Sequence, residues 1–209
     1  MFEKEIKLTA QSASTLDAVK VSPIVLNSLD GTFHQRIEDI EARRFLAAYY
    51  DSVDQVLNHN RCSLRSRLEG DHWKAAFKLK GRIEQGLSVR QEFECPVDGW
   101  LDGVDDLPEG ELKDHVLRYL EPDTPLIQRV TMDMSRTIVN LRLGQTRVEM
   151  VLDSGIIKGA TQAVELNEVE LELKSGDIEQ VMGLSEKLME SFPLIHSTQT
   201  KHAIGLSLS

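Results

Sequence analysis

Charged and apolar side chains alternate in the first residues of the chain. Glu3, Glu5 and Lys7 fall on one side of an extended strand, and Ile6 and Leu8 fall on the other. Carboxylate oxygens are the ligands that Mg2+ and Mn2+ prefer, and an ammonium group binds phosphate. Such a strand can hold a divalent cation beside an anion, although a single charged face is more often solvated.

Basic side chains repeat this alternation further along the chain. Arg65 and Arg67 share one face of a predicted strand, and Lys78 and Lys80 share one face of the next. Arg90 follows on a third strand of the same kind. Guanidinium and ammonium groups donate to phosphate oxygens, so strands brought together in this way would form an anion-binding wall.

Glutamates dominate a late segment, residues 164–174, which alternates strictly. Glu168, Glu170 and Glu172 lie on one predicted face, opposite an apolar face. Like charges on adjacent positions of one face repel each other unless cations compensate them. The repulsion is small on a solvated face, but in an enclosed site it demands a metal ion or basic neighbours.

Several strands with one charged and one apolar face predict an antiparallel sheet. An open sheet would expose the charged face to water, whereas a closed barrel would turn it into a lumen with helices packed outside. Alternation alone does not separate these two folds. The mixture of a basic wall with an acidic patch favours the barrel, because such a lumen would suit a polyphosphate with its divalent cation.

Three further segments carry local signals. Residues 177–192 are predicted to form a helix capped by Asp177, because apolar positions recur at helical spacing after this residue. Residues 37–42 are predicted to be a strand. Residues 96–111 are acidic and rich in turn formers, which predicts an exposed connection.

Turn signals divide the second half of the chain. Residues 126–133 and 136–143 are predicted to pair as a hairpin, and Ser154-Gly155 is predicted to turn the chain again. Residues 197–208 are predicted to form a last strand that carries Lys201.

Composition excludes several classes of protein. The net charge of −10 over 209 residues argues against a general nucleic-acid binder, which needs a basic surface. No apolar run reaches the length of a membrane span, and the first residues do not form a signal peptide. Cys62 and Cys95 are predicted to be free thiols. These features predict a soluble, cytoplasmic protein without nucleic-acid or membrane partners.

The charged strands resemble motifs of the CYTH superfamily, the triphosphate tunnel metalloenzymes. The matching segments, in the family's order, are Glu3-Lys4-Glu5-Ile6-Lys7 for ExExK, Tyr50-Asp51-Ser52-Val53-Asp54 for a YxDTxD-type segment, Leu64-Arg65-Ser66-Arg67 for LRxR, Phe77-Lys78-Leu79-Lys80 for a phosphate-binding strand, Arg90-Gln91-Glu92-Phe93-Glu94 for RxExE, Glu149 to Gly155 for ExxxDxG, Glu168 to Glu172 for a late acidic strand, and Thr200-Lys201 for a terminal serine-lysine pair. The resemblance spans nearly the whole chain and is nearest to the bacterial inorganic triphosphatases.

This resemblance implies an α+β fold: a closed antiparallel eight-stranded β-barrel, or tunnel, with helices packed on the outside. It implies a single domain over residues 1–209, without the histidine-rich helical domain that is often fused to this branch. One position departs from the family pattern, because Ile204 stands where the terminal motif usually has an arginine.

The resemblance also implies roles for individual residues. Substrate oxygens would be held by Lys7, Arg65, Arg67, Lys78, Lys80, Arg90, Arg136 and Lys201. Mg2+ or Mn2+ would be held by Glu3, Glu5, Glu170, Glu172 and Asp153. Catalysis would involve Glu3, Glu5, Lys7 and Glu92, with Glu3 or Glu92 orienting and deprotonating the attacking water.

The activity implied is metal-dependent hydrolysis of inorganic triphosphate to diphosphate and phosphate, by a monomer or a homodimer. Two alternatives stay open from the sequence. One is another enzyme of the family, either an adenylate cyclase or a hydrolase of thiamine triphosphate or nucleoside triphosphates. The other is a binding module for polyphosphate or nucleotides that has lost turnover.

Overall fold

A computed structural model describes residues 2–29, 40, 42–84 and 87–208 of the chain. In chain order its elements are β1 (Phe2–Ala10), α1 (Ala13–Lys20), α2 (Pro23–Leu26), β2 (Ala42–Asp51), α3 (Val56–His59), β3 (Ser63–Glu69), β4 (His72–Lys78), β5 (Arg82–Glu84), β6 (Leu87–Pro96), the 3-10 turn η3 (Val104–Asp106), α4 (Glu111–Val116), β7 (Ile127–Leu143), β8 (Thr146–Lys158), β9 (Ala163–Ser175), α5 (Ile178–Ser191), β10 (Leu194–His196) and α6 (Lys201–Leu206).

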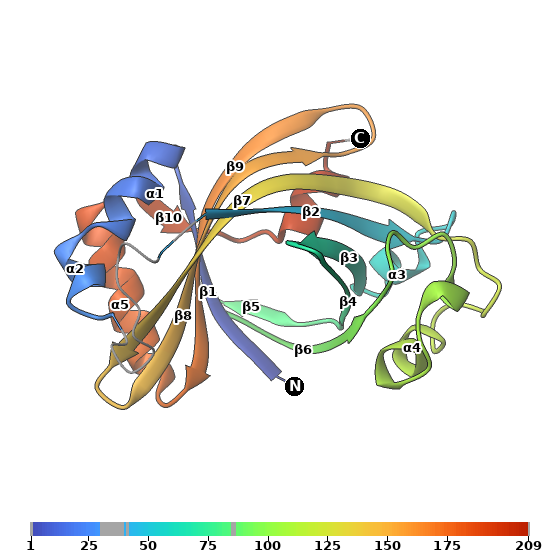
Figure 1. Ribbon diagram of the computed structural model, residues 1–209, viewed down its shortest axis with the longest axis horizontal. Helices are drawn as coiled ribbons and strands as arrows, with labels where there is room; N and C mark the ends of the chain where they lie inside the picture. Colours follow the sequence, from blue (N-terminus) through green and yellow to red (C-terminus); the bar gives the residue numbers. More distant parts are fainter. Residues whose placement is uncertain (1, 30–39, 41, 85–86, 209) are drawn as a thin grey trace.

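The strands close into a barrel. They hydrogen-bond in the order β1-β9-β8-β7-β2-β3-β4-β6, and β6 pairs back with β1, so these eight strands form a ring in which every pairing is antiparallel. The short strands β10 and β5 extend it beside β1 and β6. Helices α1, α2 and α5 gather at one end and α4 lies at the other (Figure 1). The predicted closed antiparallel barrel with helices outside is confirmed.

Strict alternation along each strand separates the two faces of the barrel wall. The outward residues of β1, β8 and β9, such as Ile6, Met150 and Val169, are buried beneath α1 and α5 in one apolar core. The outward residues of β2, β3 and β4, such as Tyr50 and Phe77, form a second core with α3 and α4. Both cores leave the charged face of each strand pointing into the barrel.

The connection between β6 and α4 is only partly exposed. Its acidic residues face solvent, as the sequence predicted. Leu101, Val104 and Leu107 are each buried in the core shared with α4. These apolar residues fasten the segment to the outer wall, so it has a fixed place at one end of the barrel.

The lumen contains an apolar cluster as well as charge. Phe45 and Tyr49 of β2 are buried together with Met132 and Met134 of β7, on the same strand faces as the charged lumen residues. Ile204 packs against this cluster, so the apolar residue at the family's arginine position covers an apolar surface.

The end of the chain is helical, so the predicted strand over residues 197–208 is wrong. The Thr200 hydroxyl caps α6 by accepting a hydrogen bond from the Ala203 amide. Within the helix, Gly205 packs directly against the Val130 side chain, where a Cβ would have no room. A short strand, β10, precedes this helix and was not predicted.

Two predicted turns are also wrong. Residues 126–133 and 136–143 do not form a hairpin, because β7 runs without interruption through Met134 and Ser135. Likewise β8 continues through Ser154 and Gly155. A Cβ on Gly155 would lie 2.2 Å from the Asp133 carbonyl oxygen, so the glycine allows the close approach of two long strands rather than a turn.

Other predictions have mixed outcomes. The helix after Asp177 is confirmed as α5, and the Asp177 carboxylate accepts a hydrogen bond from the Glu179 amide. The predicted strand over residues 37–42 falls largely outside the described residues. Cys62 and Cys95 are free thiols, as predicted. Within the described part of the chain, no helix is both long and apolar enough to cross a bilayer.

We expect Gly155→Ala to lower the free energy of unfolding by about 2 to 3 kcal/mol, because the new methyl group would force β7 and β8 apart. The matched control is Gly183→Ala in the interior of α5, where a Cβ meets nothing within 4 Å. That change should raise stability by about 1 kcal/mol through helix propensity. Urea unfolding of both variants measures the difference, and equal effects would contradict the close-packing argument.

Candidate active site

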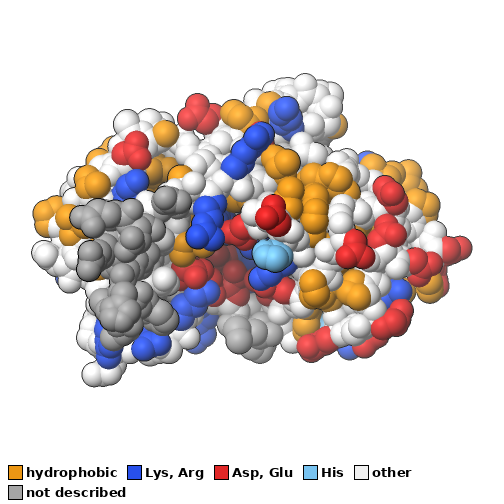
Figure 2. All heavy atoms as spheres, viewed as in Figure 1, with side chains coloured by type: hydrophobic (Ala, Val, Ile, Leu, Met, Phe, Trp, Pro, Cys, Tyr) orange, Lys and Arg blue, Asp and Glu red, His pale blue; other side chains and the backbone are white. Residues whose placement is uncertain are grey.

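A cavity of about 620 Å3 occupies the barrel lumen. Charged side chains surround the hollow in the middle of the molecule (Figure 2). Each of the barrel strands contributes to its lining, and the residues include Glu3, Glu5, Lys7, Tyr49, Arg65, Arg67, Lys78, Arg90, Glu92, Arg136, Glu149, Glu170, Glu172 and Lys201. The closure of the barrel therefore brings together residues from both ends of the chain.

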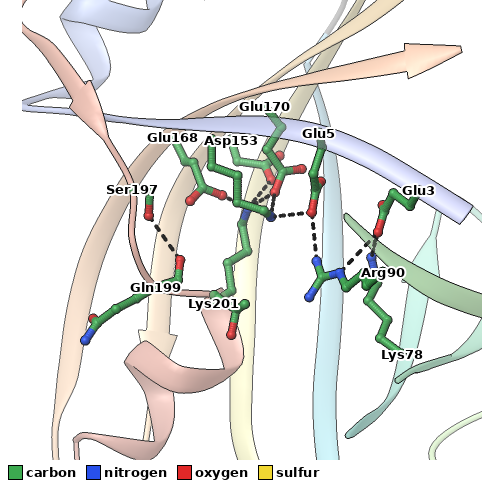
Figure 3. A network of polar contacts seen from close by, with 12 residues as sticks. Glu3, Glu5, Lys78, Arg90, Asp153, Glu168, Glu170, Ser197, Gln199 and Lys201 are labelled. Carbon is green, nitrogen blue, oxygen red and sulfur yellow. Dashed lines mark hydrogen bonds and ion pairs between the residues drawn. The ribbon is translucent and has the colours of Figure 1, made fainter. Parts of the chain in front are cut away.

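An acidic group lies at the bottom of this cavity. Strand register places Glu168 of β9 directly opposite Asp153 of β8, and Asp153 directly opposite Arg136 of β7. The Arg136 guanidinium binds the Asp153 carboxylate through two hydrogen bonds of 2.7 and 2.6 Å. The Lys201 ammonium, supplied by α6, donates to Glu168 and to Glu170, and lies 3.1 Å from Asp153 (Figure 3).

The donor set of this acidic group fits a divalent cation. Carboxylate oxygens of Asp153, Glu168 and Glu170 lie within 4.8 Å of one another. Glu168 is fully buried, and its Oε1 has no hydrogen-bond partner among the described residues. Burial raises the pKa of Glu168 to about 7 despite the nearby Lys201 and Lys7. These hard oxygen donors, one of them unpartnered, could hold a cation that prefers oxygen ligands.

A chain of ion pairs connects this group to the strands on the other side of the lumen. The Lys7 ammonium contacts Glu170 and lies 3.3 Å from Glu5. Burial opposes the charge on Lys7, but Glu170 and Glu5 raise its pKa above the ordinary value. Arg90 then donates to Glu5 at 2.8 Å and lies 3.3 Å from Glu3 (Figure 3).

Lys78 ends this chain of ion pairs. Its ammonium lies 2.8 Å from Glu3 and 3.0 Å from Glu92. Acidic and basic residues therefore alternate from Asp153 to Glu92 across the lumen, and most of the buried charge is compensated.

A second row of carboxylates crosses the lumen nearer the solvent. Glu5 of β1 is directly opposite Glu172 of β9, which is directly opposite Glu149 of β8. Lys174 lies 2.9 Å from Glu172 and 3.2 Å from Glu149. Burial, with added repulsion from Glu149 and Glu3, raises the pKa of Glu172. Like charges therefore face one another along this row, and Lys174 compensates them in part.

Arginines of β3 form a basic wall of the lumen, in which positive charge exceeds the nearby negative charge. Arg65 and Arg67 project from β3 towards Arg136 of β7, and Arg67 and Arg136 both lie over the Phe45 ring, with guanidinium carbons 5.6 and 4.8 Å from its centre. Arg65 lies 6.0 Å from the centre of the Tyr49 ring. The aromatic rings support the guanidinium planes without neutralising them.

Arg67 shows that this wall lacks negative charge. Burial, together with the neighbouring Arg65 and Arg136, lowers its pKa to about 10. Glu69 lies 3.0 Å away, but the buried Arg67 Nε has no hydrogen-bond partner among the residues described. A buried donor without a partner is costly, so this wall is arranged for an anion that supplies the missing acceptors.

Comparison with known proteins identifies the family. The model of the CYTH domain matches residues 1–203. The chain belongs to the CYTH family. Among curated proteins it is similar to an inorganic triphosphatase of Haemophilus influenzae, with 26% identity over 167 residues. The match covers 77% of this chain and 44% of that protein, so the chain spans less than half the length of this relative.

Solved structures agree on the CYTH fold. One is HpAC1 from Hippeastrum, an adenylyl cyclase candidate reported to have a dominant triphosphatase activity. It matches with a TM-score of 0.71 and 16% identity, and the match covers 98% of this chain and 95% of that one. Another is the PH1819 protein of Pyrococcus horikoshii, with a TM-score of 0.60, 14% identity and coverage of 98% and 99%. At these identities the likeness concerns the fold.

The structure brings most of the residues implied by the CYTH resemblance to one lumen. The cavity lining includes Glu3, Glu5, Lys7, Arg65, Arg67, Lys78, Arg90, Glu92, Arg136, Glu170, Glu172 and Lys201. Asp153 lies directly beneath them, fully buried. Lys80 is different, because β4 ends at Lys78 and Lys80 is exposed beyond it, outside the described cavity linings.

Sequence reasoning missed several residues of the CYTH lumen. Lys174 continues the alternation of Glu168, Glu170 and Glu172, so its place on the lumen face could have been predicted from spacing. Phe45 and Tyr49 were not singled out, because an aromatic residue on a strand carries no signal of its own for a charged lumen. The turn at residues 108–112 borders the cavity although it lies far from any charged strand, and no local signal indicates this.

Burial of the His202 imidazole makes the free energy of unfolding depend on pH. The imidazole stacks on Tyr49 with ring centres 4.8 Å apart, and burial lowers its pKa from 6.5 to about 4. Between these pH values the unfolded chain binds a proton that the folded chain does not. Stability should therefore fall as the pH drops from 6.5 to 4, by about 3 kcal/mol from this group.

His202→Phe keeps an aromatic ring against Tyr49 and removes the titrating group. We expect the variant to lose less stability than the parent protein between pH 7 and pH 4. Urea unfolding at these two pH values measures the difference. Identical pH dependence in both proteins would show that His202 does not resist protonation in the folded state.

Proposed function

We propose that this chain hydrolyses inorganic triphosphate to diphosphate and orthophosphate inside the barrel. The observation that carries the proposal is the undercompensated wall formed by Arg65 and Arg67 beside Arg136, which faces the carboxylate rows across one enclosed cavity. A linear polyanion that carries a divalent cation complements both sides at once. The inorganic triphosphatase of Haemophilus influenzae, similar over the matched region, supports this substrate.

The basic residues would hold the phosphate groups. Arg65, Arg67 and Arg136 would donate to phosphate oxygens from one side of the lumen, because their guanidinium groups already point into it. Lys78 and Arg90 would exchange part of their pairing with Glu3 and Glu5 for further phosphate oxygens. These contacts would fix the chain of phosphates along the lumen and stabilise the charge that moves to the bridging oxygen as the bond breaks.

The carboxylates would hold Mg2+ or Mn2+. Asp153, Glu168 and Glu170 at the bottom, and Glu5 and Glu172 in the second row, are the proposed ligands, with Glu3 at the edge of the group. Such an ion would offset negative charge on the phosphate oxygens. Lys7 and Lys201, which contact these carboxylates, would give up part of that pairing to the cation or turn to substrate oxygens.

The attacking water would be held by a glutamate. Glu3 and Glu92 flank the Lys78 ammonium, and both line the cavity beside Arg90. Either carboxylate would accept a proton from the water as its oxygen bonds to the terminal phosphorus. The bond from that phosphorus to the bridging oxygen breaks, and diphosphate leaves with the electron pair.

Phosphate release from the purified protein tests the proposal. The substrates should be inorganic triphosphate, ATP and thiamine triphosphate, each with Mg2+, Mn2+ or Ca2+. We expect inorganic triphosphate to have the highest kcat/KM. Preference for an organic triphosphate would replace the substrate assignment, and binding without release from any substrate would indicate a sensor.

We expect Arg67→Ala to lower kcat/KM for triphosphate by at least about tenfold, because a buried charged donor is lost from the anion-binding wall. Arg67→Lys should recover part of the loss. The matched control is Arg118→Ala, which changes an exposed arginine outside the described cavity linings and should leave kcat/KM unaltered. Steady-state kinetics measures all three variants, and equal rates for Arg67→Ala and Arg118→Ala would remove Arg67 from the site.

Glu5→Gln should lower turnover on the order of 100-fold, because a proposed cation ligand becomes neutral. EDTA should abolish activity of the parent protein, and Mg2+ or Mn2+ should restore it. Glu190→Gln on the exposed surface of α5 is the matched control. Circular dichroism separates an inactive variant from an unfolded one, and a folded Glu5→Gln protein with full activity would contradict the role of this carboxylate.

A further inference from the structure

A second, smaller cavity lies beside the lumen. Its volume is about 230 Å3, and its lining includes Asn58, Arg61, Ser63, Ser88 and Thr200. A water molecule in liquid occupies about 30 Å3, so this space is large enough for a small tetrahedral ion with some of its water.

The charge of this cavity differs from that of the lumen. Its charged lining residues, among those the structure describes, are Arg61, Lys78 and Arg90, and the described lining contains no carboxylate. Hydroxyl groups of Ser63, Ser88 and Thr200 and the Asn58 amide supply neutral hydrogen-bonding groups. Lys78 and Arg90 pair with Glu3 and Glu5 on the lumen side, and Arg61 adds a further cation. A cavity with cations and hydroxyl donors, and with no carboxylate among its described lining residues, suits an anion that carries no metal ion.

The two cavities share a wall. Ser63, Lys78, Arg90, Thr200 and His202 line both of them. Lys78 and Arg90 are residues proposed to hold phosphate in the lumen, so an anion released there is already in contact with the wall of the smaller cavity. The other three shared residues, Ser63, Thr200 and His202, add no negative charge to this wall.

Arg61 stands at this cavity in an unusual backbone conformation. Its φ is 58°, in the left-handed region that favours glycine, and it follows the C-cap residue of α3. Its guanidinium forms no ion pair with any residue in the described part of the chain. Arg61 is exposed to solvent, and a cation held at a strained backbone position beside a cavity is a candidate for binding an anion there.

The Asp51 carboxylate fixes this position. It accepts hydrogen bonds from the amides of Ser52, Leu57 and Asn58, at 2.8, 2.9 and 2.8 Å. These bonds anchor the start of α3, and the Cys62 amide bonds back to the Leu57 carbonyl at 2.8 Å. The Tyr50-Asp51-Ser52 segment, for which the proposed hydrolysis has no direct use, therefore holds the turn that carries Asn58 and Arg61.

We propose that the smaller cavity is a binding site for inorganic orthophosphate, and that it receives the phosphate released in the lumen. The source of the phosphate rests on the proposed function, whereas binding at this site does not. Arg61 is the residue specific to the site, because Lys78 and Arg90 also serve the lumen.

Titration calorimetry with inorganic phosphate in EDTA tests the site without turnover. Arg61→Gly removes the charge and suits the backbone, so it is expected to fold. We expect it to weaken phosphate binding by about tenfold, with partial recovery in Arg61→Lys. Arg67→Ala, which alters only the lumen wall, should retain this binding, and Arg118→Ala is the surface control.

The opposite pattern would overturn the proposal. Phosphate binding that survives in Arg61→Gly and is lost in Arg67→Ala would place the ion in the lumen alone. The absence of measurable phosphate binding to the parent protein would also overturn it, whether or not triphosphate is hydrolysed. If hydrolysis occurs, phosphate should inhibit it by a mixed rather than a purely competitive pattern, and Arg61→Gly should raise the inhibition constant.

Discussion

A closed barrel encloses one face of every strand, and here that face carries the charge. The compensation of buried charge is therefore the constraint on which the structure depends. Strand register sets Glu168 against Asp153, and Glu172 against both Glu5 and Glu149. Like charges at these positions would oppose closure if they stood alone. Lysines and arginines from β1, β7, β9 and α6 compensate these carboxylates, so that the barrel can close.

The buried charge is compensated more completely on the acidic side of the lumen than on the arginine side. This difference indicates what the lumen can bind. The acidic side has ammonium groups within contact distance, so its carboxylates can exchange these partners for a cation. On the arginine side, Arg65 and Arg67 lie against aromatic rings and Arg67 has one ion pair, with Glu69, so the positive charge there is only partly cancelled. A neutral ligand would satisfy neither side. A metal-bearing polyanion satisfies both, which is why a charged lumen in an acidic protein is consistent with an anionic substrate.

Much of this could be predicted from sequence, because alternation along a strand is local. Glu3, Glu5 and Lys7 share a face whatever the tertiary structure, and the CYTH motifs implied that the strands close into a barrel. The failures arise where contact between distant segments overrides a local signal. Gly155 looked like a turn residue, but the approach of β7 requires it. The tail alternates weakly, yet Thr200 caps a helix there. The Phe45 ring lies beneath the lumen arginines, and residues 108–112 border the cavity, through packing that no short pattern reports.

The position of Lys201 in the chain has a consequence for biosynthesis. This ammonium neutralises Glu168, which lies 33 residues before it, and Lys7 pairs with Glu170 across a separation of 163 residues. A ribosome therefore makes the first strand long before β9, one of its two barrel neighbours. It also makes the late carboxylates before Lys201. A nascent chain halted between β9 and α6 would hold the acidic strands without that cation, with the seam beside β1 weakened. The closed barrel with its buried carboxylates compensated therefore requires α6 as well as the eight strands.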